Sequence, residues 1–184
     1  YGLTGEGESF LAGLLEALPA LCGVGAPSVA SQIRLVPSHW AGVFRCWGRE
    51  NREAALRLVS GSTGEHDVRA NLEVKCFDLA ANPYLIIGSL FAAGLAGMRD
   101  GATLPQEVEG DPVALTKTEL AARGVRRLPQ SLGESIGALE ASDLLRDAMG
   151  DPMAEAFLAV RRAEIELFAG ASPADVVART RWRW

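Results

Sequence analysis

The feature that most constrains this fold is a run of short β-type segments set inside a chain whose other parts carry helical patterning. β-branched and aromatic side chains concentrate in three segments that glycines separate. Short runs of this kind, bounded by glycine, are typical of strands joined by turns. We therefore predict three antiparallel strands, with turns near Glu50–Asn51 and near Gly61–Gly64. The segments are 43–47, 54–59 and 68–77.

Two helical patterns flank these strands. Between Ser9 and Leu18 the apolar side chains recur three and four residues apart, which predicts an amphipathic helix that ends at Pro19, with a loop to about residue 28. Asn82 followed by Pro83 combines a cap residue with proline at the first helical position, and an uncharged apolar stretch runs on to residue 98. That stretch is shorter than the roughly 20 residues that span a bilayer. We therefore expect a buried helix and no membrane contact.

The last third of the chain carries helix start signals. Ser131 with Glu134 has the spacing of a capping box, and two cap-proline pairs follow at 151–152 and 172–173. Apolar residues across 153–168 predict a long amphipathic helix. The predicted fold class is α+β, with a small antiparallel sheet of about three to four strands packed with helices and a helical C-terminal half. A length of 184 residues predicts a single domain, 1–184.

Charge and cysteine content restrict the partners and the compartment. Eighteen basic residues stand against 23 acidic ones, a net charge of −5, which argues against nucleic acid or anionic membranes as partners. An arginine-tryptophan tail at 179–184 is the one feature that would favour stacking on nucleic acid, and the acidic balance disfavours it. Cys22, Cys46 and Cys76 show no CxxC spacing, so we expect reduced thiols and a cytoplasmic location.

Charged residues stand out within and beside the strand segments. They are Arg34, Arg52, Arg57, Glu73 and Lys75. A charge at a strand position is costly unless it is solvated, paired or faces a ligand. The residue pattern alone leaves open both a solvated sheet face and a ligand site.

Four motifs in order give these charges a context. The chain reads Arg34-Leu35-Val36-Pro37, then Asn51-Arg52 with Arg57 five residues on, then Leu72-Glu73-Val74-Lys75, then Asp78-Leu79-Ala80-Ala81-Asn82-Pro83-Tyr84. Each is weak alone, but together they resemble the C-terminal half of the catalytic domain of the glutamine synthetase superfamily. Further motifs are similar to its nodulin-type and γ-glutamyl-amine ligase branch. These are Trp40-Ala41-Gly42, Cys46-Trp47-Gly48, Glu50-Asn51-Arg52-Glu53-Ala54 and Arg181-Trp182-Arg183-Trp184.

The resemblance implies an ATP-dependent carbon-nitrogen ligase. Such enzymes phosphorylate the γ-carboxylate of glutamate, and an amine or ammonia then displaces phosphate from γ-glutamyl phosphate to form an amide. Phosphoryl transfer between anions needs cations around the oxygens, so ATP with Mg²⁺ or Mn²⁺ is expected. The resemblance also implies a ring-shaped homo-oligomer.

The resemblance assigns roles residue by residue. Arg34 matches the arginine that holds the amino-acid substrate and is a catalytic candidate together with Lys75. Arg52 and Arg57 match the arginines that contact the ATP phosphates, to which Lys75 also contributes. Glu73 matches a carboxylate ligand of the bridging metal, and a carboxylate oxygen suits such a hard cation.

Two residues depart from the family pattern. Lys75 stands where an arginine is usual, so the charge is kept without the two-pronged geometry. Trp40 stands where a loop glutamate is usual, and an indole cannot accept a proton from ammonium. The substrate-binding role implied for Trp40 is therefore contact with an amine larger than ammonia, through cation–π attraction. The alternative is that Trp40 only packs the loop.

The resemblance places the N-terminal domain and the first half of the catalytic domain, with the remaining metal ligands, upstream of the matched motifs. One carboxylate cannot complete the octahedral oxygen shell of Mg²⁺, so we expect this segment alone to be inactive. Two alternatives stay open at this point. One is ordinary glutamate–ammonia ligation, and the other is a non-catalytic protein that keeps the fold as a scaffold.

Overall fold

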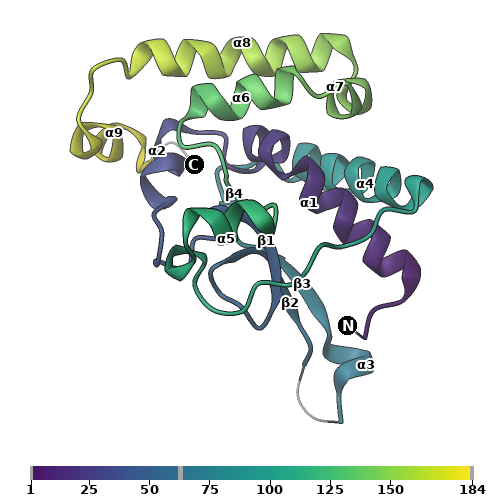
Figure 1. Cartoon of the computed structure of the whole chain (residues 1–184). Helices are drawn as coiled ribbons and strands as arrows, with labels where there is room; N and C mark the ends of the chain where they lie inside the picture. The colour runs from purple at the N-terminus through teal and green to yellow at the C-terminus, as the bar shows by residue number, and fades with distance from the viewer. Residues whose placement is uncertain (1, 62–63, 183–184) are drawn as a thin grey trace. The chain divides into compact units, whose positions relative to one another are not determined.

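The computed structural model describes residues 2–61 and 64–182 (Figure 1). The chain falls into two compact units. The first unit comprises Tyr1–Glu16, Leu35–Cys76 and Gly94–Leu128, and the second comprises Ala17–Arg34, Phe77–Ala93 and Pro129–Trp184. The single-domain assignment stays a prediction. The predicted turn near Gly61–Gly64 and the end of the arginine-tryptophan tail, Arg183 and Trp184, lie at least in part outside the described residues.

The first unit is built on a four-stranded sheet with the order β3-β2-β1-β4. Its strands are β1 (Phe44–Arg49), β2 (Ala54–Val59), β3 (Asn71–Val74) and β4 (Arg126–Arg127). The central pair β1–β2 is parallel, whereas β3 and β4 pair antiparallel with β2 and β1 respectively. The α+β class is confirmed, and the all-antiparallel sheet is wrong for the central pair.

The predicted hairpin at Glu50–Asn51 does not form, and Phe44 lies opposite Ala54 in the parallel pair. In the segment that joins β1 to β2, the buried amide of Asn51 donates from Nδ2 to the carbonyl oxygens of Val108 and Gly110, at 2.7 and 2.8 Å. These side-chain bonds join segments far apart in the sequence, and strand periodicity does not report them.

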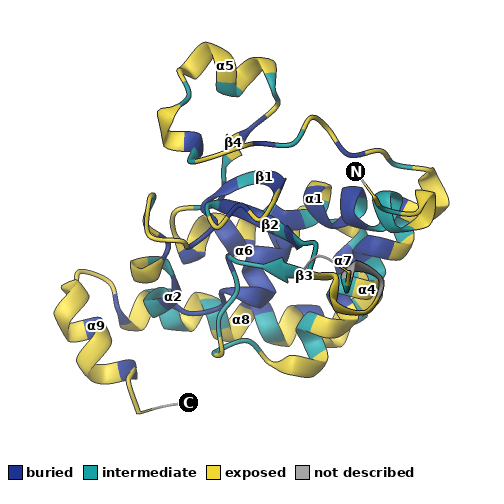
Figure 2. Ribbon diagram, turned by 90° about the horizontal axis from the view of Figure 1, so that it is seen from below, coloured by how far each residue is buried: buried dark blue, intermediate teal, exposed yellow. Residues whose placement is uncertain are grey.

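Burial of β1 and β2 fixes the core of the first unit (Figure 2). Trp47 is fully buried, and its indole Nε1 donates to the carbonyl oxygen of Pro105 at 2.8 Å. Ala54, Ala55 and Leu56 are fully buried one after another, so both faces of β2 are covered. Cys46 and Cys76 of this unit, and Cys22 of the second unit, are buried and form no disulfide bond among the described residues. Burial raises the pKa of the Cys46 thiol to about 12, so this thiol stays protonated.

Helix α1 (Gly5–Gly25) continues past the predicted stop at Pro19. An interior proline costs a helix about 3 kcal/mol, but Leu18, Leu21 and Val24 are fully buried and offset that cost. The predicted loop to residue 28 is therefore mostly helix. By length and composition α1 could cross a membrane, which is weak support for a span because 56% of that stretch is buried within the protein.

The second unit contains the helical C-terminal part of the chain. Its helices there are α6 (Leu132–Glu140), α7 (Asp143–Met149), α8 (Asp151–Leu167) and α9 (Pro173–Thr180), and α2 (Val29–Arg34) belongs to the same unit. Ser131 and Ser172 cap α6 and α9 as predicted, whereas Gly150 and not Asp151 takes the cap position of α8. The short helices α3 (His66–Arg69), η1 (Pro112–Ala114) and α5 (Lys117–Ala122) lie in the first unit.

Helix α4 (Pro83–Asp100) forms where the sequence predicts it, with Asn82 Oδ1 accepting from the amide of Tyr84 at 3.0 Å. The prediction of a buried helix is wrong for one face. Large apolar side chains spaced three and four residues apart along this face remain exposed within the described part of the chain. They are Tyr84, Ile87, Phe91, Leu95 and Met98.

Glycines allow the buried side of α4 to approach α1 closely. A Cβ at Gly97 would lie 2.3 Å from the carbonyl oxygen of Ser9 and 2.7 Å from Cα of Gly13. We expect Gly97→Ala to lower the free energy of unfolding by about 1–3 kcal/mol, because backbone must move to admit the methyl group. Gly88 on the same helix has nothing within 4 Å of such a Cβ. Gly88→Ala should therefore raise stability by roughly 0.5–1 kcal/mol, and urea unfolding that ranks the two variants the other way would contradict this packing.

Candidate functional site

Arg57 and Glu73 form the centre of the candidate site in the first unit. They lie directly opposite each other in the antiparallel pair β2–β3, so their side chains share one face of the sheet. Arg57 Nη1 donates to Glu73 Oε2 at 3.1 Å, and Nη2 donates to Glu50 Oε2 at 2.9 Å. The predicted phosphate-binding arginine and the predicted metal ligand are therefore in contact.

Lys75 directly follows β3 and contacts the same carboxylate. Its Nζ lies 3.8 Å from Glu73 Oε2. Gly42 packs against the base of Lys75, since a Cβ at Gly42 would be 2.6 Å from Cβ of Lys75. The cluster of Arg57, Glu73, Lys75 and Glu50 thus holds two cations and two carboxylates around the paired positions Arg57 and Glu73 of β2 and β3.

The electrostatics of this cluster favour the charged forms of Arg57 and Glu50. Burial lowers the pKa of Arg57, but hydrogen bonds to the carboxylates of Glu73 and Glu50 outweigh burial and raise it above its ordinary value. The backbone N–H of Ser60 lowers the pKa of Glu50, and Arg57 adds to this effect. Nε of Arg57 is buried and has no hydrogen-bond partner within the described part of the chain. Burying an N–H donor costs free energy unless an acceptor takes its hydrogen bond, and a phosphate oxygen is such an acceptor.

Trp40 and Arg52 form a second contact in the first unit. Cζ of Arg52 lies 5.5 Å from the centroid of the indole, within cation–π range. Trp40 is 62% exposed, so part of the ring remains accessible beside Arg52. One predicted amine contact and one predicted phosphate contact are therefore neighbours.

Arg34 ends helix α2 in the second unit. Its Nη2 donates to the carbonyl oxygen of Phe77 at 3.0 Å. Arg34 lines a hollow of about 290 Å³ together with Asp78, Leu79 and Arg181. Its convergence with Arg52, Arg57 and Glu73 stays a prediction.

A buried ion pair holds the other end of α2. Glu164 Oε1 accepts from the hydroxyl of Ser28 at 2.6 Å and from the amide of Val29 at 3.1 Å, and Oε2 lies 2.9 Å from Nη1 of Arg161. The same Nη1 donates to the carbonyl oxygen of Pro27 at 2.7 Å. Sequence reasoning missed this role. The available signal was a glutamate within the apolar stripe of the helix over 153–168.

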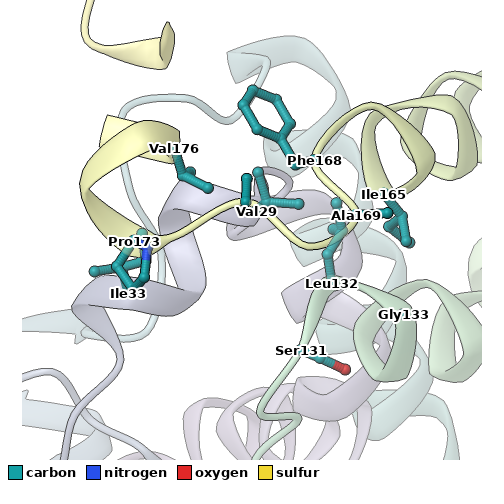
Figure 3. A pocket seen from close by; sticks show the side chains of 11 residues that line it. Val29, Ile33, Ser131, Leu132, Gly133, Ile165, Phe168, Ala169, Pro173 and Val176 are labelled. Atoms are coloured by element: carbon teal, nitrogen blue, oxygen red, sulfur yellow. The ribbon is translucent and has the colours of Figure 1, made fainter. Parts of the chain in front are cut away.

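A larger hollow in the second unit is apolar (Figure 3). It measures about 420 Å³ and lies among α2, α6, the end of α8 and α9. None of the residues that line it is ionisable, so it offers no group for phosphoryl or proton transfer. Its lining includes Val29, Ile33, Leu132, Ile165, Phe168 and Val176.

The residues fit ATP better than they fit a complete metal site. The unpartnered Nε of Arg57 and the adjacent Lys75 suit phosphate oxygens. Among the residues that the structure describes, no group of three or more His, Cys, Asp or Glu side chains could hold a metal ion. Glu73 fits as one oxygen ligand of Mg²⁺ or Mn²⁺, and the other ligands would have to come from elsewhere.

The mixed sheet of the first unit thus brings an arginine, a lysine and two carboxylates into contact. The sequence profile described as "Glutamine synthetase, catalytic domain" matches residues 1–177. The chain belongs to this family, which confirms the resemblance found in its motifs.

Curated relatives point to the same family. The chain is 53% identical over 183 residues to "Gamma-glutamylpolyamine synthetase GlnA3" of Streptomyces coelicolor, covering 100% of this chain and 39% of that protein. It is 37% identical over 162 residues to the glutamine synthetase of Mycobacterium tuberculosis, covering 88% and 36% respectively. The chain thus spans about two fifths of the length of these relatives.

Solved structures agree in fold. A structure titled "Crystal structure of novel glutamine synthase homolog" matches with a TM-score of 0.81 and 32% identity, covering 99% of this chain and 39% of that one. An ADP complex of GmaS matches with a TM-score of 0.76 and 29% identity, covering 93% and 38% respectively. The predicted fold of a glutamine synthetase catalytic-domain fragment is therefore confirmed.

Proposed function

We propose that this chain is the C-terminal catalytic portion of an ATP-dependent ligase that joins the γ-carboxylate of glutamate to an amine. The observation that carries the proposal is the contact among Arg57, Glu73 and Lys75, three residues that the family motifs assign to one phosphoryl-transfer site. Family membership and 53% identity to a protein named as a polyamine ligase support it.

Each side chain has a role in this mechanism. Arg52 and Arg57 bind phosphate oxygens of ATP, and the unpartnered Nε of Arg57 supplies one donor. Lys75 offsets the charge that builds on the transferred phosphoryl group. Arg34 holds the carboxylate of glutamate through its planar fork. Glu73 is one ligand of Mg²⁺ or Mn²⁺, which when bound neutralises charge on the phosphates.

Trp40 favours an amine larger than ammonia as the acceptor. A loop carboxylate would accept a proton from ammonium, and the indole at this position cannot. An amine with a hydrocarbon chain can rest against the exposed ring instead. A polyamine is the acceptor class that best fits this surface, and the name of the Streptomyces relative agrees with it.

The same proposal covers assembly and location. We place the complete ligase in the cytoplasm as a homo-oligomer, with the remaining metal ligands supplied by polypeptide outside these 184 residues. This segment alone is then inactive, since Glu73 provides a single oxygen ligand group.

The acceptor class is tested in the full gene product by Trp40→Glu. We expect the preference for putrescine over ammonium, as a ratio of kcat/KM values, to fall about tenfold or more, because a carboxylate can take a proton from ammonium and the ring surface is lost. Trp40→Phe keeps an aromatic surface and should keep the preference. Phosphate release with each acceptor measures the ratio.

Two outcomes would favour the alternative functions. Equal use of ammonium and putrescine by the wild-type protein, unchanged in Trp40→Glu, would indicate ordinary glutamate–ammonia ligation. Absence of ATP-dependent phosphate release with glutamate and any amine would indicate a non-catalytic scaffold protein.

A further inference from the structure

The loop that carries Trp40 has an unusual backbone. Ser38, Trp40 and Gly42 all take left-handed conformations, with φ of 58°, 55° and 63°. This region is unfavourable for residues with a Cβ, and such strain persists only where the surroundings hold it in place. The loop therefore needs contacts that fix it.

Two carboxylates supply those contacts. Glu53 Oε1 accepts from the backbone N–H of Trp40 at 2.9 Å, and Asp111 Oδ2 accepts from the hydroxyl of Ser38 at 2.6 Å. Each bond meets a residue that has a left-handed backbone. Hydrogen bonds to ionised acceptors are about twice as strong as neutral ones, so this pair opposes the strain where it arises.

Asn51 anchors both carboxylates. Its Oδ1 accepts from the backbone N–H of Glu53 at 2.9 Å, and its Nδ2 donates to the carbonyl oxygens of Val108 and Gly110, which lead directly to Asp111. Asn51 is only 8% exposed. One buried amide thus fixes the two segments that hold the Trp40 loop.

The held loop sets how the indole meets a substrate. Arg52 lies over the ring at 5.5 Å, and a second cation near the same ring is repelled by the guanidinium. The exposed part of the ring therefore suits a methylene chain better than an ammonium group. An extended amine satisfies both conditions, because its chain can cross the indole while its charged ends lie farther away.

We propose that Glu53 and Asp111 are positioning residues that set acceptor selectivity by holding Trp40 against Arg52. This inference rests on the proposed function and deepens it. It assigns the ring to the hydrocarbon part of an extended amine, and it assigns selectivity to two carboxylates that do not touch the acceptor.

The test uses the full gene product with Glu53→Ala and Glu53→Gln. Glu53→Ala removes the acceptor of the Trp40 amide, so hydrogen exchange at that amide should speed up about tenfold. The kcat/KM ratio for spermidine over ammonium should fall by a similar factor, through a higher KM for spermidine. Glu53→Gln keeps a carbonyl acceptor, so most of the protection and of the ratio should return.

Asp111→Ala should act in the same direction as Glu53→Ala, and Asp111→Asn should restore both readouts. Glu109→Ala is the matched control, because Glu109 is an exposed carboxylate of the same segment. It should change neither readout by more than about twofold, as is usual for surface substitutions.

The outcomes separate this inference from the proposed function. Unchanged exchange and an unchanged ratio in Glu53→Ala would overturn both parts of it. Faster hydrogen exchange at the Trp40 amide with an unchanged kcat/KM ratio would show that the Glu53 contact only stabilises the loop, and it would overturn the selectivity role. A wild-type protein with no ligase activity would overturn the proposed function and the selectivity role together, while the exchange experiment would still decide whether Glu53 holds the loop.

Discussion

Glu73→Gln in the full gene product is expected to reduce ATP- and glutamate-dependent phosphate release by about 10²- to 10³-fold. The carboxylate lies 3.1 Å from Arg57 and 3.8 Å from Lys75, so an amide in its place removes one negative charge from beside two cations, while Arg57 keeps its ion pair with Glu50. It also removes the proposed oxygen ligand of a catalytic metal, an interaction worth several kcal/mol in the transition state. Steady-state phosphate release at saturating ATP, followed across a Mg²⁺ titration, measures the loss.

A control carboxylate separates this effect from a general loss of surface charge. Glu65, just before the short helix α3, pairs with Arg69 at 3.1 Å, and the two side chains are 41% and 64% exposed. Exposed pairs contribute little, so Glu65→Gln should keep activity within about twofold. If Glu73→Gln retains more than about a tenth of wild-type activity while its far-ultraviolet circular dichroism is unchanged, Glu73 is not a metal ligand of this reaction.

Glu164→Ala is expected to give the largest loss of stability, about 3–5 kcal/mol in the free energy of unfolding. The side chains of Glu164 and Arg161 are only 10% and 13% exposed. Removal of the carboxylate leaves the Arg161 charge buried, and it takes the acceptor from the Ser28 hydroxyl and the Val29 amide. Urea unfolding followed by circular dichroism measures the change.

The chain offers a close match as the control for this pair. Glu140 contacts Arg162 at 2.6 Å, and both side chains are 50% exposed. Glu140→Ala should cost no more than about 1 kcal/mol. Equal losses for the two variants would show that burial does not strengthen the Glu164 pair.

A second prediction for Glu164 concerns Arg34, since Glu164 holds the start of α2 and Arg34 is the last residue of that helix. Glu164→Gln, which keeps an acceptor, should raise KM for glutamate more than it lowers kcat.

Part of the candidate site could be predicted from the sequence because it depends on motifs and on neighbouring residues. Motif order identified Arg57, Glu73 and Lys75 as one set, and strand alternation explains why their side chains meet once β2 and β3 pair. The helix starts at Asn82, Ser131 and Ser172 also depend only on neighbouring residues, and all three cap as predicted.

Other parts of the site depend on contacts between distant segments. The contact between Glu53 and the Trp40 amide spans 13 residues, and that between Ser38 and Asp111 spans 73. No periodicity encodes such pairs, so the restraints on the Trp40 loop were invisible in the sequence. The same holds for Glu164, whose partner Ser28 lies 136 residues away.

The sequence by itself determined the family, the α+β class, the helix starts and the identities of the charged residues, because each depends on local patterns or on motif order. Only the tertiary structure decided that β1 and β2 run parallel, that α1 continues through Pro19, and that one face of α4 is exposed within the described part of the chain. In the first two cases the deciding free energy comes from burial and hydrogen bonds between distant segments, and in the third it depends on which segments pack against the helix. Such terms outweigh local propensities of about 1–3 kcal/mol, and they exist only after the chain has folded.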